Sequence, residues 1–362
     1  MISSQKEFLS RFGWDGFFQS QILTLSSESL FIGRVINEEK NLYRIQYGEE
    51  KTIWSAVSGK MNYEAMGRID YPAVGDWVLA ELSPGSDKAV IRFIFKRKTI
   101  LQRKKNGDVS EIQILATNVD YVFITTSINS DLNFGRLERY LTFARESGAE
   151  PVILLTKTDL GENVEETMNK CEERFPGVKI HALSRDSFMS SEFLKTYLEP
   201  GKTSVLVGSS GVGKSTLANF LIGEEAITTR EIRIDDDKGM HTTTSRALYE
   251  CLYGGLIIDT PGMRELQFSD HEAGLNAQFE DVEDLISRCH FSNCRHETEK
   301  DCAILMALDS GELDSARWKS YGKIAKEVRH SMRKQHSWIL AQDRKEWKKL
   351  SVMCRQKYKG WR

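Results

Sequence analysis

The sequence predicts a multidomain protein in which a small all-β barrel is followed by an α/β domain with a parallel sheet and by a mostly helical C-terminal part. Short β-rich runs lie near the N-terminus, apolar strands alternate with helical stretches from Val119 onward, and three cysteines gather beside a histidine beyond residue 281. With 362 residues, the chain is also long for one compact domain. We therefore expect several units that each bury a core of their own.

The composition, with 40% hydrophobic and 28% charged residues, is ordinary for a globular protein. No apolar run is long enough to cross a bilayer, and the N-terminus has polar and acidic residues where a secretory signal needs an apolar stretch. These features predict a cytoplasmic protein without membrane contact, and we expect a monomer.

The barrel prediction rests on five short β-rich runs separated by turn residues, with no strong helix between them. They are Leu30–Ile36, Leu42–Tyr47, Thr52–Val57, Asp76–Leu82 and Ala89–Phe95. Five strands fit an OB-like barrel, here assigned to residues 29–105, and an SH3-like barrel is the alternative. Residues 1–28 form an N-terminal extension with an amphipathic stretch at Phe8–Phe18, and the Lys- and Arg-rich segment Arg97–Glu111 is interpreted as an exposed connection.

The α/β prediction, assigned to residues 106–280, rests on a rhythm of apolar strands and helices. The expected strands are Val119–Thr126, Val152–Leu155, Val178–Leu183, Ser204–Val207 and Gly255–Asp259, and the expected helices include Phe134–Ser147, Val164–Arg174 and one that begins at Gly213. Because strands that alternate with helices pair in parallel, we expect a sheet covered by helices.

A Walker A pattern follows one of these strands and opens the next helix. It reads Gly208-Ser209-Ser210-Gly211-Val212-Gly213-Lys214-Ser215, with Thr216 in the helix that follows. In this context, backbone N–H groups converge on phosphate, Lys214 neutralises the β- and γ-phosphates, and Ser215 holds Mg²⁺. A glycine-rich turn without nucleotide is the alternative.

Two further motifs identify the nucleotide. Asp259-Thr260-Pro261-Gly262 ends an apolar strand and matches the Asp-x-x-Gly of P-loop GTPases, in which the Asp lies near Mg²⁺ and the glycine N–H near the γ-phosphate. Thr156-Lys157-Thr158-Asp159 ends another strand and resembles the guanine-recognition loop. Its carboxylate can accept two hydrogen bonds from guanine, whereas adenine offers neither donor. Asp159 as a simple helix cap is the alternative.

The order of the motifs is inverted, because the guanine loop precedes the phosphate loop and no comparable motif follows Gly262. A circularly permuted GTPase keeps the same parallel sheet when the native chain ends lie close together. In the strand after the guanine loop, a backbone N–H at Ala182 is a further candidate contact to the guanine oxygen.

The cysteine cluster has the spacing Cys289-x4-Cys294-x-His296-x5-Cys302. Three thiolates and one imidazole complete a tetrahedral zinc shell with no position left for water, which predicts one structural zinc in a C-terminal domain at residues 281–362. Chance clustering of cysteines in packed helices is the alternative.

With the permuted order, the loop Lys238–Thr244 and the cysteine cluster, the chain resembles the RsgA (YjeQ/YloQ) family of GTPases that depend on the small ribosomal subunit. The resemblance also covers Gly75-Asp76-Trp77-Val78, Ala116–Asp120 and Arg136–Leu141. It implies an OB-fold, a permuted GTPase domain and a zinc domain that act together in late maturation of the 30S subunit. Thr156 departs from the commoner Asn, which is expected to cost this loop a bracing hydrogen bond, and His181-Ala182 stands where Ser-Ala is common.

Met263 occupies the place where Ras-like GTPases carry the glutamine that orients the attacking water. The resemblance implies that His241 positions water instead, and a loop histidine without a catalytic role is the alternative. One of Thr242, Thr243 and Thr244 is expected to complete the Mg²⁺ shell. Isolated turnover of GTP to GDP is expected to be slow.

The formal net charge is only −2, but Ala316–Arg362 holds fifteen Lys or Arg against three acidic residues. Aromatic side chains interleave these charges at Trp318, Tyr321, Trp338, Trp347, Tyr358 and Trp361. Such a segment can bind RNA, here 16S rRNA, although a solvated helical face is the usual interpretation. Two other functions stay open: a GTPase switch that docks a protein partner through the barrel, and an ATP-using P-loop enzyme.

Overall fold

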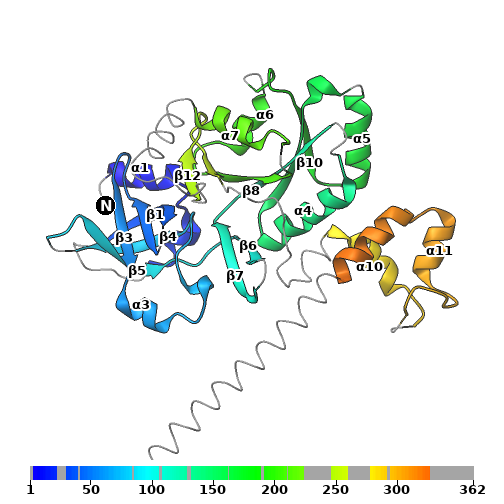
Figure 1. The fold of residues 1–362 in the computed structure, drawn as a ribbon, viewed down its shortest axis with the longest axis horizontal. Helices are drawn as coiled ribbons and strands as arrows, with labels where there is room; N and C mark the ends of the chain where they lie inside the picture. Colours follow the sequence, from blue (N-terminus) through cyan, green and yellow to red (C-terminus); the bar gives the residue numbers. More distant parts are fainter. Residues whose placement is uncertain are drawn as a thin grey trace, which may run out of the picture. The chain divides into compact units, whose positions relative to one another are not determined.

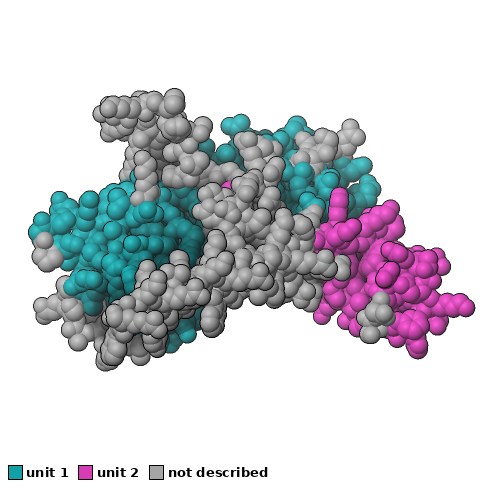
Figure 2. All heavy atoms as spheres, turned by 60° about the horizontal axis from the view of Figure 1, so that its bottom comes forward, with its two compact units in different colours: residues 1–102, 113–266 teal, residues 103–112, 267–362 magenta. Residues whose placement is uncertain are grey.

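The computed structural model describes residues 3–22, 30–39, 41–83, 85–105, 108–128, 132–161, 163–188, 191–209, 211–223, 246–259, 278–291 and 294–326. The chain divides into two compact units (Figures 1 and 2). The first comprises residues 1–102 and 113–266, and the second comprises residues 103–112 and 267–362.

The first unit contains the predicted five-stranded barrel. Its strands are β1 (Leu30–Glu39), β2 (Leu42–Gln46), β3 (Thr52–Val57), β4 (Trp77–Leu82) and β5 (Lys88–Ile94). They pair in the order β1-β2-β3-β5-β4, and β4 returns to pair with β1, so that the barrel closes. The OB-like prediction is therefore confirmed, with helix α3 (Gly59–Glu64) in the connection between β3 and β4.

Alternation along the strands fills the barrel. Val35, Tyr43, Ile45, Val78 and Ile91 are fully buried and form one apolar cluster. Because successive side chains of a strand point to opposite faces, each strand contributes every second residue to this interior. A buried ion pair holds the residue that precedes β4. Asp76 accepts two hydrogen bonds from the Arg97 guanidinium, at 2.7 and 2.8 Å.

The interpretation of Arg97–Glu111 as an exposed connection was wrong. Strands β6 (Ile100–Lys105) and β7 (Asp108–Thr117) form a separate two-stranded sheet. Asn106 and Gly107, between the two strands, lie outside the described residues. Leu101 of β6 and Leu115 of β7 are 0% and 2% exposed. In the sequence, the many Lys and Arg residues of this segment made the alternation of apolar residues that predicts a strand difficult to recognise.

The N-terminal segment forms two short helices, α1 (Ser3–Arg11) and α2 (Gly16–Gln19). Phe8, Phe12, Trp14 and Phe18 are buried in the same cluster as barrel and α/β side chains, whereas Phe17 is exposed. Trp14 packs edge-on against Trp77 and Phe95 of the barrel, with ring centroids 5.1 and 5.0 Å apart. The amphipathic stretch predicted at this position is therefore an integral part of the first unit.

The α/β part of this unit confirms the predicted parallel sheet. Its elements are β8 (Tyr121–Ser127), α4 (Phe134–Ser147), β9 (Glu150–Thr156), α5 (Val164–Arg174), β10 (Lys179–Leu183), α6 (Glu192–Tyr197), β11 (Thr203–Gly208), α7 (Lys214–Ile222), β12 (Ala247–Glu250) and β13 (Leu256–Asp259). The order β10-β9-β8-β11-β13 is parallel throughout. Strand β12 is antiparallel to β13 and was not predicted.

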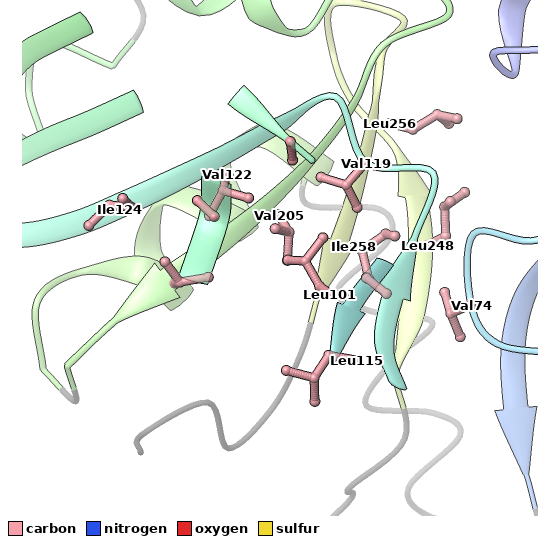
Figure 3. Packing of buried hydrophobic residues seen from close by; sticks show 14 of the residues in the cluster. Val74, Leu101, Leu115, Val119, Val122, Ile124, Val205, Leu248, Leu256 and Ile258 are labelled. Carbon is pink, nitrogen blue, oxygen red and sulfur yellow. The ribbon is translucent and has the colours of Figure 1, made fainter. Parts of the chain in front are cut away.

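One sheet joins the barrel to the α/β part, because β12 pairs with β13 on one side and with barrel strand β1 on the other. The core is continuous across this junction. Figure 3 shows Val74 of the barrel near Leu248 of β12, in the cluster that also holds Val122 and Ile258. Barrel and sheet therefore share one hydrophobic core.

Helices cover both faces of the sheet. In β8, Val122 and Ile124 belong to one cluster with Leu141 of α4, whereas Phe123 between them belongs to another with Leu217 of α7. Strands buried on both faces read as continuous apolar runs, which is why they were visible in the sequence.

The second unit is mostly helical, as predicted. It contains α10 (Glu280–Ser287), α11 (Ala303–Ser310) and a helix at residues 315–326. Phe279, Val282, Ile304 and Ile324 form its buried core. Within the described ranges, no helix of the protein has the length and apolar character that crossing a bilayer requires.

Candidate functional site

The predicted phosphate loop connects β11 to α7. Gly208 has a left-handed φ of +141°, and a Cβ at this residue would lie 2.1 Å from the carbonyl oxygen of Thr125. Only glycine fits this approach. Gly213, also left-handed, caps α7, and Ser215 and Thr216 are exposed in its first turn. Ser210 lies outside the described residues.

Lys214 turns back over the loop. Its ammonium group donates to the carbonyl oxygens of Gly208, at 2.8 Å, and Ser209. The positive charge of Lys214 therefore lies at the start of the loop, beside the N-terminus of α7, where anions are favoured.

The predicted guanine loop starts at the last residue of β9. Thr156 is 4% exposed, and its hydroxyl is 2.6 Å from the carbonyl oxygen of Val212 in the phosphate loop and 3.1 Å from that of Thr126. The departure from Asn therefore leaves a bracing hydrogen bond in place, contrary to our expectation. This bond joins the base loop directly to the phosphate loop.

Beyond Thr156, the chain turns sharply. Lys157 adopts a left-handed φ of 58°, and Thr158–Leu160 form a single 3₁₀ turn. Asp159 is exposed on this turn. An exposed carboxylate on this turn is accessible to a ligand, and the role predicted for Asp159 stays a prediction.

Register brings the motifs to one edge of the sheet. Leu183 and Ser127 flank Thr156, and Gly208 pairs with Thr125. Since these strands are parallel, the phosphate loop, Thr156–Asp159, Ala182 and Asp259 all lie at the carboxyl edge, where ligands bind in open α/β sheets. The inverted chain order thus builds one contiguous edge.

Ala182, the further candidate contact to the guanine oxygen, and its neighbour His181 have different environments. Ala182 is a half-buried residue of β10. The His181 ring stacks on Phe193 at 4.0 Å, and its Nε2 lies 3.0 Å from the Tyr197 hydroxyl. Burial, and secondarily the charge of Lys179, lowers the pKa of His181. His181 therefore packs β10 against α6.

Asp259 is the last residue of β13 and is half-buried. Its register partner in β12 is Ala247. The rest of its motif, Thr260 to Gly262 with Met263, lies outside the described residues, as do His241 and Thr242 to Thr244. The roles predicted for those residues stay predictions.

The second unit brings together the four predicted metal ligands. The sulfur atoms of Cys289, Cys294 and Cys302 and a ring nitrogen of His296 all lie within 4.8 Å of one another. His296 Nδ1 is 3.6 Å from Cys289 Sγ and 3.4 Å from Cys302 Sγ, and these two sulfurs are 3.9 Å apart. The cluster could therefore hold a metal ion.

Two aromatic residues of the basic tail lie in the described range, and both pack on the protein. Trp318 contacts the His296 ring edge-on at 5.4 Å and stacks on Tyr321 at 5.5 Å. Arg317 forms two hydrogen bonds of 2.6 Å with Asp281, and it lowers the pKa of that carboxyl against the effect of burial. Trp338, Trp347, Tyr358 and Trp361 lie outside the described residues.

Sequence reasoning missed Arg34, which is 1% exposed although it is charged. An arginine in a β-rich run is normally predicted to face solvent, and nothing in the neighbouring residues indicates that Arg34 is buried. The hydrogen bond of the Thr156 hydroxyl to Val212 was also missed, because these residues are far apart in the chain.

Comparisons with known families agree with this geometry. The RsgA GTPase family profile matches residues 94–269, and a profile described as a 50S ribosome-binding GTPase matches residues 203–339. A protein of Oceanobacillus iheyensis named small ribosomal subunit biogenesis GTPase RsgA 1 is 40% identical over 89% of this chain and 92% of its own length. One of Listeria monocytogenes, named RsgA 2, is 38% identical over 96% and 97%.

Two solved structures are similar in fold. The crystal structure of YjeQ from Thermotoga maritima superimposes with a TM-score of 0.61 at 27% identity, covering 83% of this chain and 98% of that one. The crystal structure of YloQ, described as a circularly permuted GTPase, gives a TM-score of 0.59 at 25% identity, covering 85% and 98%.

Proposed function

Because this chain belongs to the RsgA family of GTPases, we propose that it binds the small (30S) ribosomal subunit and hydrolyses GTP to GDP and phosphate during late maturation of that subunit. The observation that carries the proposal is the contiguous edge of the sheet, where the Thr156 hydroxyl joins the base loop to the phosphate loop. The names of the similar proteins support the choice of the small subunit.

The assignment of roles follows from position. We assign the phosphate groups to the backbone of residues 208–213 and to Lys214, whose ammonium group already lies over the loop. Magnesium bound with GTP neutralises charge on the β- and γ-phosphates, and the Ser215 hydroxyl and the Asp259 carboxylate would hold it. Gly262 would contact the γ-phosphate, and His241 would position the attacking water.

Base recognition is assigned to Asp159, with the backbone of Ala182 as a second contact. Replacement of Asp159 by Asn exchanges one acceptor oxygen for a donor, which suits xanthine better than guanine. The variant Asp159→Asn should lose GTP hydrolysis and gain hydrolysis of xanthosine triphosphate. The comparison is made with Glu165→Gln, an exchange of the same kind in the first turn of α5. An unchanged preference for GTP in Asp159→Asn would remove this assignment and reopen the ATP alternative.

Zinc is the metal that we assign to the cysteine cluster. In a tetrahedral shell with Zn–S bonds of about 2.3 Å, neighbouring sulfurs are about 3.8 Å apart. The separation of 3.9 Å between Cys289 and Cys302 fits this shell. A Cys₃His set leaves no open position, so we assign one structural zinc per chain.

The proposed partner contacts include 16S rRNA, through the barrel and the basic residues beyond Ala316, in a cytoplasmic monomer. An alternative in which the barrel docks a protein has one observation in its favour. Tyr63 in α3 and Met66 just after it are 90% and 92% exposed. Apolar side chains so exposed on a barrel suit either a protein surface or stacked bases.

The deciding experiment measures GTP hydrolysis by the full chain alone and with purified 30S subunits over a range of salt. We expect at least about tenfold stimulation, which corresponds to ~1.4 kcal/mol of barrier. Because one matching profile is described as a 50S ribosome-binding GTPase, hydrolysis is also measured with the same amounts of 50S subunits. The variant Lys214→Ala shows how much hydrolysis comes from contaminating nucleotidases. The absence of stimulation by 30S subunits at every salt concentration would favour the protein-docking alternative.

A further inference from the structure

Arg34 occupies an unusual position for a charged residue. It lies on β1, it is 1% exposed, and no described carboxylate lies within ion-pair distance of it. Burial lowers its pKa to about 10, while Asp120 and Asp76 act in the opposite direction. The side chain therefore stays protonated at neutral pH. A buried charge of this kind is costly unless its hydrogen bonds are well satisfied.

Three separate segments satisfy the Arg34 guanidinium. Its Nη1 donates to the Phe12 carbonyl at 2.6 Å, its Nε to the Gly75 carbonyl at 3.1 Å, and its Nη2 to the Asn118 carbonyl at 3.1 Å. These carbonyls belong to the N-terminal segment, to the loop before β4 and to the chain that leads into β8. One side chain therefore ties the N-terminal segment, the barrel and the entry to the GTPase sheet together.

Asn118 completes this arrangement from the other side. Its backbone has a left-handed φ of 54°, which Asn tolerates better than most residues. Its side-chain amide donates to the Gly75 carbonyl at 3.1 Å, and its Oδ1 accepts from the Lys98 N–H at 2.8 Å. Its own N–H donates to the Thr99 carbonyl. The Gly75 carbonyl thus accepts from both Arg34 and Asn118.

Close backbone contacts lie beside an open pocket at this junction, which Arg34 and Asn118 both line. Gly75 has a φ of +98°, and a Cβ there would lie 2.1 Å from the carbonyl oxygen of Thr117. The Thr117 N–H donates to the Val74 carbonyl. The N-terminal segment also reaches the GTPase part, since the Gly201 N–H donates to the Arg11 carbonyl at 2.8 Å. The barrel, the N-terminal helices and the sheet meet here through short backbone contacts.

Strand β8 leads from this junction to the nucleotide site. It begins at Tyr121, shortly after Asn118, and its middle residues Val122 to Ile124 are fully buried. At its carboxyl end, Gly208 of the phosphate loop lies against Thr125, and the Thr156 hydroxyl oxygen, whose shorter contact is to Val212, lies 3.1 Å from the Thr126 carbonyl oxygen. A displacement at the amino end of β8 therefore reaches both nucleotide loops through one rigid strand.

We propose that Arg34 is a positioning residue that makes the barrel, the N-terminal helices and the GTPase sheet one rigid body, so that contact of a partner with the barrel changes GTP hydrolysis through β8. This inference rests on the proposed function for the identity of the partner. Arg34 touches no nucleotide-binding residue, and its effect on turnover is indirect.

The test replaces Arg34 by Met, which keeps the length of the side chain and removes every donor. In Arg34→Met, stimulation of kcat by 30S subunits should fall at least about tenfold, a usual size for coupling between sites. The basal kcat and the KM for GTP should stay within about twofold of the wild type, because the nucleotide loops are untouched. Arg34→Lys, which keeps the charge and part of the donors, should recover part of the stimulation.

Arg174→Met is the matched control. Arg174 pairs with the buried Glu138, at 3.1 Å, between α5 and α4, away from the junction. Its loss also removes a buried charged contact, but stimulation should persist. If Arg34→Met keeps its stimulation, or loses no more of it than Arg174→Met, the proposal is wrong.

Amide exchange gives a second readout that does not depend on ribosomal subunits. The N–H groups of Thr117, Asn118 and Gly201 cross between the joined segments. Their exchange should become at least about tenfold faster in Arg34→Met, while that of Val207 in β11 stays unchanged. Equal exchange at all four amides would overturn the proposal.

The kinetic and exchange measurements distinguish a failure of the proposed function from a failure of the role proposed for Arg34. A wild-type protein that 30S subunits do not stimulate contradicts the proposed function, and the exchange data then decide on the rigid body alone. If Arg34→Met fails to fold, Arg34→Gln takes its place, because a shorter, neutral amide keeps two donors but cannot bridge the Phe12, Gly75 and Asn118 carbonyls. Arg34→Gln should show the same loss of stimulation and the same faster exchange, and wild-type behaviour in both would refute the proposal.

Discussion

Two threonines near the nucleotide edge differ in the hydrogen bonding of their hydroxyl groups. Thr156 and Thr126 are both buried, at 4% and 3% exposure. The hydroxyl of Thr156 bonds to the Val212 carbonyl, whereas that of Thr126 has no hydrogen-bond partner in the described part of the chain. An unsatisfied buried hydroxyl costs free energy, so the same substitution should act oppositely at the two positions.

We expect Thr156→Val to weaken nucleotide binding. The change leaves the Val212 carbonyl without its donor at a cost of about 1–3 kcal/mol, and it uncouples the base loop from the phosphate loop. The dissociation constant for GDP, measured by titration with a fluorescent analogue, should rise about tenfold. Thr126→Val is the control, and its melting temperature should equal or exceed that of the wild type. Unchanged affinity in Thr156→Val would show that the bond does not organise the site.

At the scale of single elements, the sequence predicted what local chemistry determines. Helix α4 has the predicted bounds because Asn133 caps its start and Gly148, with a φ of 83°, ends it. The apolar strands of the parallel sheet were equally visible. Strand β12 was missed because it has only four residues and its partners, β1 and β13, are set by tertiary structure.

The candidate site was predicted to a similar extent. Glycine spacing and strand ends predicted the phosphate loop and the guanine loop, and the spacing of three cysteines and a histidine predicted the four side chains whose ligand atoms lie within 4.8 Å of one another. The bond between Thr156 and Val212 could not be predicted, because it depends on the distance between two loops from different parts of the chain. Arg34 could not be predicted either, since its burial depends on three carbonyls brought together only by the fold.

The junction of β11 with the phosphate loop supports a prediction at this scale. Gly208→Ala places a methyl group 2.1 Å from the Thr125 carbonyl in a left-handed conformation, so β11 has to separate from β8. Such strain costs on the order of 1–3 kcal/mol before the clash is added. Affinity for GTP, measured by calorimetry, should fall at least about tenfold. Gly59→Ala, where nothing lies within 4 Å of the added Cβ, should bind GTP like the wild type. Normal affinity in Gly208→Ala would contradict the described register.

At the scale of the whole molecule, the two units have separate cores and are expected to respond separately to metal removal. Cys302 is 2% exposed and belongs to the core of the second unit as well as to the cysteine cluster. Small metal-binding domains depend on their metal to fold. Loss of zinc should therefore unfold the second unit and leave nucleotide binding by the first intact.

Cys302→Ser tests this expectation. Zinc content, measured by elemental mass spectrometry, should fall from one ion per chain to near zero, and amides at residues 303–310 should lose protection against exchange. Affinity for GDP should stay within about twofold, because the nucleotide edge belongs to the first unit. Cys171→Ala, which changes a buried cysteine outside the cluster, should keep its zinc. Full zinc content in Cys302→Ser would refute the assigned ligand set.

The single pairing of Ala247 with Asn37 on one side and with Asp259 on the other has a further consequence. Strand β12 would be the last strand of the GTPase sheet if barrel strand β1 did not pair with it at Ala247. An uncovered strand offers unpaired N–H and C=O groups to other chains, and it is a known origin of aggregation. We therefore expect that a GTPase fragment cut free of the barrel would expose the Ala247 end of β12 to pairing with other chains.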